Sequence, residues 1–376
     1  MASTHYAVGR ETRVRNSSPM LTLRARLVLL VLLCGGACAP AAPQVGQPAA
    51  AAAQPTRDGG ATGSAPALSA PRAVDQLRVS WSSVSSGFLP FHAALERGLF
   101  EQRGLKVEPV FTSGAQAVTA LVAGELDAAY TDGAALVRAR LAGADTVVLA
   151  STSNAFPYKL IGEPALQSTN DLRGKRLGIT RTGSTSDFAA RYMLRTLGLA
   201  PGEDVALIQT GTGQEMMPAL AAGAINAAVL GEPLAHEARR QGYTFLYDLG
   251  ALPVEYPTTA LGSLRSTVGE RPEALRAFVG GLVEATAWVK QNRAEAREVL
   301  ARFTRLEDPE AIDAGYEEVA ERFVQAPYPT LGGIMTILES TRAEDPRVAD
   351  AQPADFIEDR FVRELDQSGF IRQLYP

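Results

Sequence analysis

From residue 75 to about residue 250, short apolar runs alternate with segments whose apolar positions recur every three or four residues. The first pattern is typical of buried strands and the second of amphipathic helices. We expect strands at 77–80, 106–110, 128–130 and 146–150, separated by helices at 88–97, 115–123 and 134–142. A second set of strands is expected at 176–180, 205–209, 227–230 and 244–247. Because strands that alternate with helices form mainly parallel sheets covered by those helices, the pattern predicts an α/β fold.

Part of the sequence is repeated along with this alternation. Residues 113–130 are echoed about 99 positions later by residues 212–229, and each copy has a small loop, a short helix, an Ala-Gly turn and a buried strand. The alternative to an internal duplication is that the two Ala-rich segments are similar by chance. The repeat predicts two similar α/β lobes, lobe 1 from 75–162 plus 254–376 and lobe 2 from 166–250.

Two hinge crossings are expected between these lobes. Residues 158–162 and 257–261 are predicted to be the connecting strands, and the helical residues that follow are predicted to pack on lobe 1. In sheets of this kind the ligand lies beyond the carboxyl ends of the strands. The ligand cleft is therefore expected between the lobes.

The first 74 residues are interpreted as a targeting region. Two arginines, an apolar run at 27–33 and small residues at 35–37 precede Cys38, which is the arrangement of a secretory signal. Residues 1–38 are the expected signal peptide, with Met20 as the expected start, and Cys38 is the expected lipidation site of a lipoprotein. An ordinary signal-peptidase cut is the alternative. Residues 39–74, rich in Ala, Pro and Gly, are expected to form a disordered tether.

Composition argues against several classes of function. The net charge of −5 and the lack of a basic run argue against a nucleic-acid surface. Both cysteines, Cys34 and Cys38, lie in the signal, so no thiol chemistry is expected in the mature chain. His92 and His236 are too few to form a Cys/His zinc site, and no G-x-S-x-G motif indicates a serine hydrolase. No metal and no cofactor are expected.

A hydroxyl-rich loop follows the first strand of each lobe and opens a helix. The candidate ligand-binding residues in these loops are Ser82, Ser83, Ser85 and Ser86 in lobe 1 and Gly183, Ser184, Thr185 and Ser186 in lobe 2. The first N–H groups of a helix have no partner within the helix and favour an anion. Ordinary helix capping by Ser and Thr is the alternative interpretation.

Other candidates lie at strand ends. Asp132 is suited to accept a hydrogen bond from a ligand amine or ring N–H, or to cap a helix. Glu232 is a candidate ligand contact or a favourable first-turn carboxylate. Thr212, which opens the second copy of the repeat, is also a candidate. Phe88 and Tyr130, together with Trp81, are candidates for a wall that stacks on a ligand, although core packing is the simpler interpretation.

Five stretches resemble the substrate-binding proteins of ABC importers, in the family that binds sulfonates, nitrate, taurine and thiamine-pyrimidine precursors. They are residues 91–105, 124–129, 171–186, 223–233 and 274–292. The resemblance implies a periplasmic-binding-protein type II fold, with lobes that close on a ligand, and a membrane permease as partner. It implies ligand contacts at Ser82–Ser86, Ser113, Thr131, Asp132, Gly183–Ser186 and Glu232. The family does not fix the ligand.

The function expected from the sequence is binding without a chemical step. The protein is expected to be a monomeric lipoprotein at the periplasm or cell surface that captures a small organic solute for import. A sulfonate, a taurine-like amine and a pyrimidine precursor all remain open as the ligand. A ligand-sensing receptor domain is the alternative. An enzyme of thiamine-pyrimidine synthesis is disfavoured, because the resemblance implies a cysteine-rich motif that the mature chain lacks.

Overall fold

The structure is a computed structural model that describes residues 75–112, 114–342 and 345–375. The chain divides into two units, Met1–Ala67 and Leu68–Pro376, and all described residues belong to the second. The predictions for the signal peptide, Cys38 and the tether lie outside the described residues, as does Ser113.

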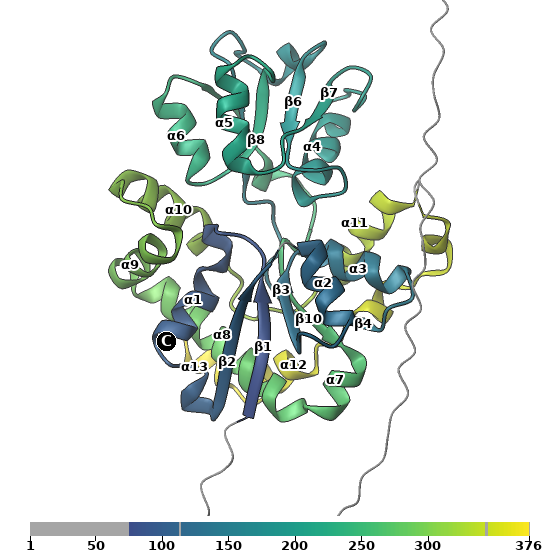
Figure 1. The fold of residues 1–376 in the computed structure, drawn as a ribbon, viewed down its shortest axis with the longest axis vertical. Helices are drawn as coiled ribbons and strands as arrows, with labels where there is room; N and C mark the ends of the chain where they lie inside the picture. The colour runs from purple at the N-terminus through teal and green to yellow at the C-terminus, as the bar shows by residue number, and fades with distance from the viewer. Residues whose placement is uncertain (1–74, 113, 343–344, 376) are drawn as a thin grey trace, which may run out of the picture. The chain divides into compact units, whose positions relative to one another are not determined.

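The first sheet has five strands in the order β2-β1-β3-β10-β4 (Figure 1). Strands β1, β2 and β3 are parallel, whereas β10 is antiparallel to both of its neighbours. Their bounds are β1 Asp75–Trp81, β2 Leu105–Phe111, β3 Ala128–Thr131, β4 Thr146–Ser153 and β10 Thr259–Leu264.

The second sheet has the order β7-β6-β8-β5-β9. Here β6, β7 and β8 are parallel, and β5 is antiparallel to β8 and β9. The bounds are β5 Tyr158–Gly162, β6 Arg176–Ile179, β7 Ala206–Gln209, β8 Ala227–Gly231 and β9 Thr244–Asp248. Both sheets therefore place a single antiparallel strand between their third and fourth parallel strands, which confirms the predicted pair of similar, mainly parallel α/β sheets.

The antiparallel strands correct the predicted position of the first crossing. Residues 158–162 were assigned to lobe 1, but β5 pairs with β8 and β9 and so belongs to the second sheet. The second crossing strand, β10, lies in the first sheet between β3 and β4. The two crossing segments run side by side before these strands, since Tyr256 N donates to Asn154 O at 2.9 Å and Thr258 N to Ser153 O at 3.0 Å.

Helices connect the parallel strands. Those of the first sheet are α1 Leu89–Glu96, α2 Gly114–Val122 and α3 Gly133–Leu141, and those of the second are α4 Thr185–Thr196, α5 Gly213–Ala221 and α6 Leu234–Arg240. Short 3-10 helices lie at η1 Ser86–Phe88, η2 Glu101–Arg103, η3 Thr169–Leu172, η4 Leu249–Ala251, η5 Pro346–Asp350 and η6 Pro353–Phe356. The predicted repeat is visible in the elements, because α2 and β3 occur again as α5 and β8 about 99 residues later.

After β10 the chain is helical: α7 Arg265–Glu270, α8 Pro272–Gln291, α9 Arg293–Thr304, α10 Pro309–Arg322, α11 Leu331–Thr341, α12 Arg360–Gln367 and α13 Phe370–Gln373. Helix α8 packs on α1 and on strands β1 and β2, where Phe278 stacks on Phe100 with ring centroids 4.7 Å apart. Helix α10 instead contacts both η1 and α6. Within the described part of the chain no helix has the length and apolar character to cross a membrane.

Candidate functional site

Loops at the carboxyl ends of strands from both sheets line a cavity of about 330 Å³, which we call the acidic cavity. The first sheet contributes residues 83–87 after β1, and the second contributes residues 231–234 after β8, with Thr180 after β6 and Gln214 on α5. Helices α9 and α10 supply a third wall through Thr304, Leu306, Glu318 and Val319. Two of the lining residues, Glu232 and Glu318, are carboxylates.

A second hollow of about 510 Å³, which we call the arginine cavity, also includes Thr180 in its lining. It is lined by Arg138 on α3, by Asp132, and by residues 180–184 of the loop before α4. The Arg138 guanidinium donates a hydrogen bond to Gly183 O. Arg181 is exposed and forms no side-chain ion pair with any described residue.

A larger hollow of about 650 Å³ lies between α4 and α11. Its lining comes from helix surfaces and from residues 253–255, and none of the predicted site residues takes part. Loops at strand ends of both sheets converge at the acidic cavity and the arginine cavity, so these two form the candidate ligand site.

The loop before α4 has the predicted strand-to-helix geometry. Ser184 is the N-cap of α4, and its hydroxyl accepts from Asp187 N at 3.3 Å. The hydroxyls of Thr180, Ser184 and Ser186 form a triangle with sides of 2.8, 2.9 and 3.0 Å. Gly183 has a φ of +75°, which favours glycine because a side chain is strained there. The loop is thus held by its own hydroxyls, and Gly183 and Ser184 line the arginine cavity.

The loop after β1 is held by fewer polar contacts of its own. Ser85 precedes η1 without a side-chain capping bond, and Ser83 is exposed. The Ser86 hydroxyl is buried and finds no hydrogen-bond partner among the described residues. Ser83, Ser85 and Ser86 line the acidic cavity, whereas Ser82 lines neither cavity.

Asp132 is the N-cap of α3, and its Oδ1 accepts from Ala135 N at 3.0 Å. Burial raises the pKa of Asp132, and the nearby Arg138 acts in the opposite direction. Burial, followed by the charge of Asp132, also raises the pKa values of Tyr158 and Tyr256. The capping role is therefore present, and Asp132 also lines the arginine cavity.

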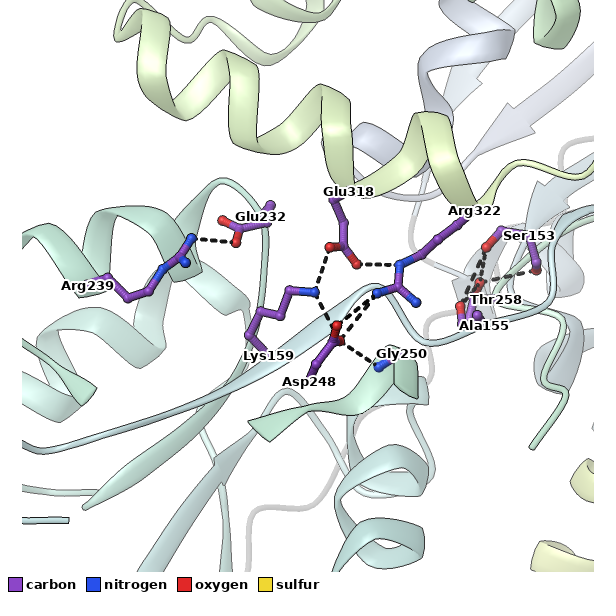
Figure 2. A network of polar contacts seen from close by, with 10 residues as sticks. All are labelled: Ser153, Ala155, Lys159, Glu232, Arg239, Asp248, Gly250, Thr258, Glu318 and Arg322. Carbon is purple, nitrogen blue, oxygen red and sulfur yellow. Dashed lines mark hydrogen bonds and ion pairs between the residues drawn. The ribbon is translucent and has the colours of Figure 1, made fainter. Parts of the chain in front are cut away.

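Glu232 lies before α6, and its side chain is only 4% exposed. Its Oε2 accepts from His236 N at 2.8 Å, and its Oε1 pairs with Arg239 Nη2 at 3.0 Å (Figure 2). The carboxylate is thus oriented by the first turn of α6 while it lines the acidic cavity.

Glu318 belongs to a cluster of four alternating charges, shown in Figure 2. Lys159 Nζ lies 2.9 Å from Asp248 Oδ1 and 2.7 Å from Glu318 Oε2. Arg322 contacts the same two carboxylates at 3.2 and 2.8 Å. Burial raises the pKa of Glu318 against the opposing effects of Lys159 and Arg322. For Asp248 burial is the largest single effect and acts upward, but Lys159, the Gly250 N–H and Arg322 together outweigh it and lower the pKa. The cluster joins β5 and β9 to α10.

Figure 2 also shows part of the two crossing segments, which are joined by hydrogen bonds from one side chain. Thr258 Oγ1 donates to carbonyl oxygens of Ser153 at 3.2 Å and Ala155 at 2.9 Å. Because each crossing constrains the other, the two segments form one paired connection.

Several predicted contacts lie elsewhere, and this corrects the expected ligand wall. Tyr130 is fully buried, its OH lies 2.5 Å from Thr152 Oγ1, and its ring meets Phe88 edge-on at 5.2 Å. Both aromatics belong to the core and line neither cavity. Thr212 caps α5 by accepting a hydrogen bond from Glu215 N, and it lines neither cavity. Thr185 and Ser186 are buried in the first turn of α4.

The Thr131 hydroxyl is buried without a hydrogen-bond partner among the described residues. It lies near the start of α2, since a Cβ on Gly114 would sit 3.0 Å from it. Thr131 lines neither cavity itself, but Gly114 and its neighbour Asp132 line the arginine cavity.

His92 packs against aromatic side chains. Its ring stacks on Phe303 at 4.1 Å, and burial lowers its pKa to about 4. His236 lies on α6, and neither histidine lines the acidic or the arginine cavity. In the described ranges no group of three His, Cys, Asp or Glu side chains is placed to hold a metal ion.

The wall formed by α9 and α10 was not predicted. Residues beyond 306 showed no chemical motif, yet Glu318 and Val319 line the acidic cavity. Their positions follow from the packing of α10 against η1 and α6, which are more than 70 residues away along the chain. No local sequence signal reports such a contact.

Comparison with known proteins agrees with this architecture. Residues 72–304 match the sequence model of the NMT1-like family. A Brucella abortus protein named as a candidate binding protein is 28% identical over 219 residues, which cover 57% of this chain and 67% of that protein.

Two solved structures share the fold at low sequence identity. The alkanesulfonate-binding protein SsuA from Xanthomonas axonopodis, bound to MOPS, superposes with a TM-score of 0.62 at 20% identity, over 77% of this chain and 100% of that chain. The nitrate-binding protein NrtA from Synechocystis gives 0.64 at 18% identity, over 81% and 91%.

Proposed function

Because the chain belongs to the NMT1-like family, we propose that it is the substrate-binding protein of an ABC-type importer. It captures a small organic solute between its two sheets and delivers the solute to a membrane permease. The observation that carries the proposal is the acidic cavity, which is lined by strand-end loops of both sheets and by α9 and α10. The names of the two structural relatives, an alkanesulfonate-binding and a nitrate-binding protein, support a small polar solute.

The predicted site residues divide between the two cavities. Ser83, Ser85, Ser86 and Glu232 serve the acidic cavity, and Asp132, Gly183 and Ser184 serve the arginine cavity. Arg138 and Arg181 give the second cavity cations that no described carboxylate pairs with within 4 Å. An anionic group of the solute, such as a sulfonate or carboxylate, therefore binds there, beside the hydroxyls of the loop before α4.

The proposed role involves no chemical step. Neither described histidine lines the acidic or the arginine cavity, so neither is placed to act there as a general base. The proposal includes a periplasmic or cell-surface location, a monomeric state and an anchor at Cys38, which follow from the sequence signal. Labelled palmitate that fails to attach to the chain in a lipoprotein-competent host would refute the anchor.

The binding site is tested with two matched N-cap variants. Ser184 and Thr212 each accept a 3.3 Å hydrogen bond from the backbone of the first turn, but only Ser184 lines a cavity. Either change to Ala costs about 1 kcal/mol of stability through loss of the cap. Ser184→Ala should also weaken solute binding about two- to tenfold, since one hydrogen bond contributes roughly 0.5–1.5 kcal/mol.

The probe is the solute identified by mass spectrometry after the purified protein is denatured, and calorimetric titration gives its dissociation constant. Equal affinities for the two variants would remove Ser184 from the site. If no solute is released and no alkanesulfonate, nitrate or aminosulfonate binds at millimolar concentration, the binding function itself is refuted.

A further inference from the structure

The charges around the acidic cavity are arranged unlike those around the arginine cavity. Two carboxylates and no Lys, Arg or His side chain line the acidic cavity within the described ranges. The cations nearest to these carboxylates lie behind them: Arg239 pairs with Glu232, and Lys159 and Arg322 pair with Glu318. A group that enters the cavity therefore meets acceptor oxygens before it meets any cation.

Glu318 has unused acceptor capacity. Its side chain is 7% exposed, and Oε2 contacts Lys159 Nζ at 2.7 Å. Oε1 lies 2.8 Å from Arg322 Nε, but at an angle that makes no hydrogen bond, so this buried oxygen accepts none from the described residues. The charge of Arg322 compensates this oxygen electrostatically, but no hydrogen bond is made to it, and a buried acceptor without a hydrogen bond is costly. A ligand donor within the cavity would remove that cost.

Lys159 and Arg322 compensate the Glu318 carboxylate in its buried position. A buried carboxylate is stable as an anion only when cations or donors compensate its lost hydration. Figure 2 shows Lys159 between Glu318 and Asp248, with Arg322 closing the cluster on its other side. Asp248 belongs to this cluster but does not line the cavity.

Glu232 presents a second carboxylate from another part of the lining, at the start of α6. Its two oxygens already contact His236 N and Arg239, but a carboxylate can accept about four hydrogen bonds. An oxyanion that contacts Glu232 or Glu318 would meet carboxylate oxygens and find no cation on the lining to pair with, and like charges at close range are mutually unfavourable.

We propose that the acidic cavity selects a nitrogen donor group of the ligand, either an ammonium or amidinium cation or a ring N–H, and that Glu318 is its principal acceptor. This inference rests on the proposed binding function and specifies which part of the solute enters this cavity. The hydroxyls of Ser85 and Ser86 and the apolar side chains of Val84 and Leu306 complete a pocket suited to a compact, partly apolar body.

The test uses two probes of the same shape and opposite charge, benzamidinium and benzoate, titrated calorimetrically into the full chain. The wild-type protein should bind benzamidinium at least about tenfold more tightly than benzoate, because a hydrogen bond to a charged group contributes roughly 1.5–3 kcal/mol. Glu318→Gln should remove about tenfold of the benzamidinium affinity. Asp248→Asn removes the same charge from the same cluster without touching the cavity and should change that affinity by less than about twofold.

Two results would overturn the inference. One is benzoate binding as tightly as benzamidinium, or neither probe binding. The other is an equal loss of affinity in Glu318→Gln and Asp248→Asn, which would reduce Glu318 to a structural member of the cluster. If Glu318→Gln does not fold, Glu232→Gln tests the second carboxylate with the same probes and the same expected direction.

The solute released on denaturation separates this inference from the proposed function. A solute with a donor nitrogen supports both. A simple oxyanion without nitrogen donors would overturn the inference and leave the binding function intact. No binding of either probe would overturn the inference alone, and the binding function would be refuted as well only if no solute is released and no alkanesulfonate, nitrate or aminosulfonate binds.

Discussion

In each sheet an acidic residue follows the third strand, but the two acidic side chains have different partners. Asp132 follows β3 and caps α3, beside an arginine that donates to a backbone carbonyl rather than forming an ion pair. Glu232 follows β8 and forms an ion pair with Arg239. One acid has its pKa raised by burial, whereas the other is compensated by a cation. Acids at the corresponding strand ends of the repeated fold, one residue apart in the repeat, thus have different charge environments at the cavities.

The same repeat keeps its main-chain anchors away from the cavities. Asp127, just before β3, accepts from Arg78 N at 2.7 Å, and Asn226, just before β8, accepts from Arg176 N at 3.1 Å. In both sheets this side chain fixes the start of the third strand against the first. The comparison teaches that the repeated frame is held by contacts at the amino ends of the strands, while the carboxyl ends are free to differ.

The largest expected effect comes from removing these anchors. Asp127→Ala loses the bond from Arg78 N and the 2.6 Å ion pair with Arg271, and should lower the free energy of unfolding by about 2–3 kcal/mol. Asn226→Ala loses the bond from Arg176 N and the 3.1 Å bond that its amide donates to Glu163, but no ion pair, and should cost less, about 1–2 kcal/mol. Urea unfolding of both variants measures the two values. Equal losses would show that the Arg271 ion pair contributes nothing.

A smaller effect is expected at Glu232. Glu232→Gln keeps an acceptor for His236 N but leaves Arg239 without its carboxylate, so stability should fall by about 1–2 kcal/mol. The double variant with Arg239→Gln should recover part of this loss, because neither charge then remains unpaired. Thermal unfolding measures each variant. No recovery in the double variant would mean that the ion pair does not hold Glu232.

Much of the fold could be predicted from the chain because its signals are local. The alternation of apolar runs and helical periods, and the Ala-Gly turns of the repeat, each report on a few neighbouring residues. The sequence pattern does not indicate which of the two sheets contains β5, because a crossing strand is apolar in either sheet. Only its pairing with β8 and β9 decides the question.

The site was predictable where it is made of strand-end loops and not where it is made of long-range packing. Ser85, Ser184 and Glu232 follow strands, so their convergence is implied by the parallel sheet. Tyr130 is of a residue type that often stacks on ligands, but its side chain is fully buried in the core. Glu318 is one acid among several on an amphipathic helix, and only the packing of α10 against η1 and α6 brings it to the cavity.

The smallest expected effect is at Asp132. Its pKa is raised in the folded protein above the ordinary value of about 3.9, so the folded state binds the proton more tightly than the unfolded chain. The stability that Asp132 contributes is therefore fully present below about pH 4 and is lost as the pH rises through the raised value. Asn caps a helix as well as Asp does and cannot ionise.

Asp132→Asn should therefore change the free energy of unfolding by less than about 1 kcal/mol at pH 7. Relative to wild type, the variant should become more stable as the pH rises from 3 to 8, because it escapes the cost of ionising a half-buried carboxyl beside Tyr158 and Tyr256. Urea unfolding of wild type and variant from pH 3 to pH 8 measures the difference. A difference that stays flat across this range would give Asp132 an ordinary pKa, and the contrast with Glu232 would then lie in the ion pair alone.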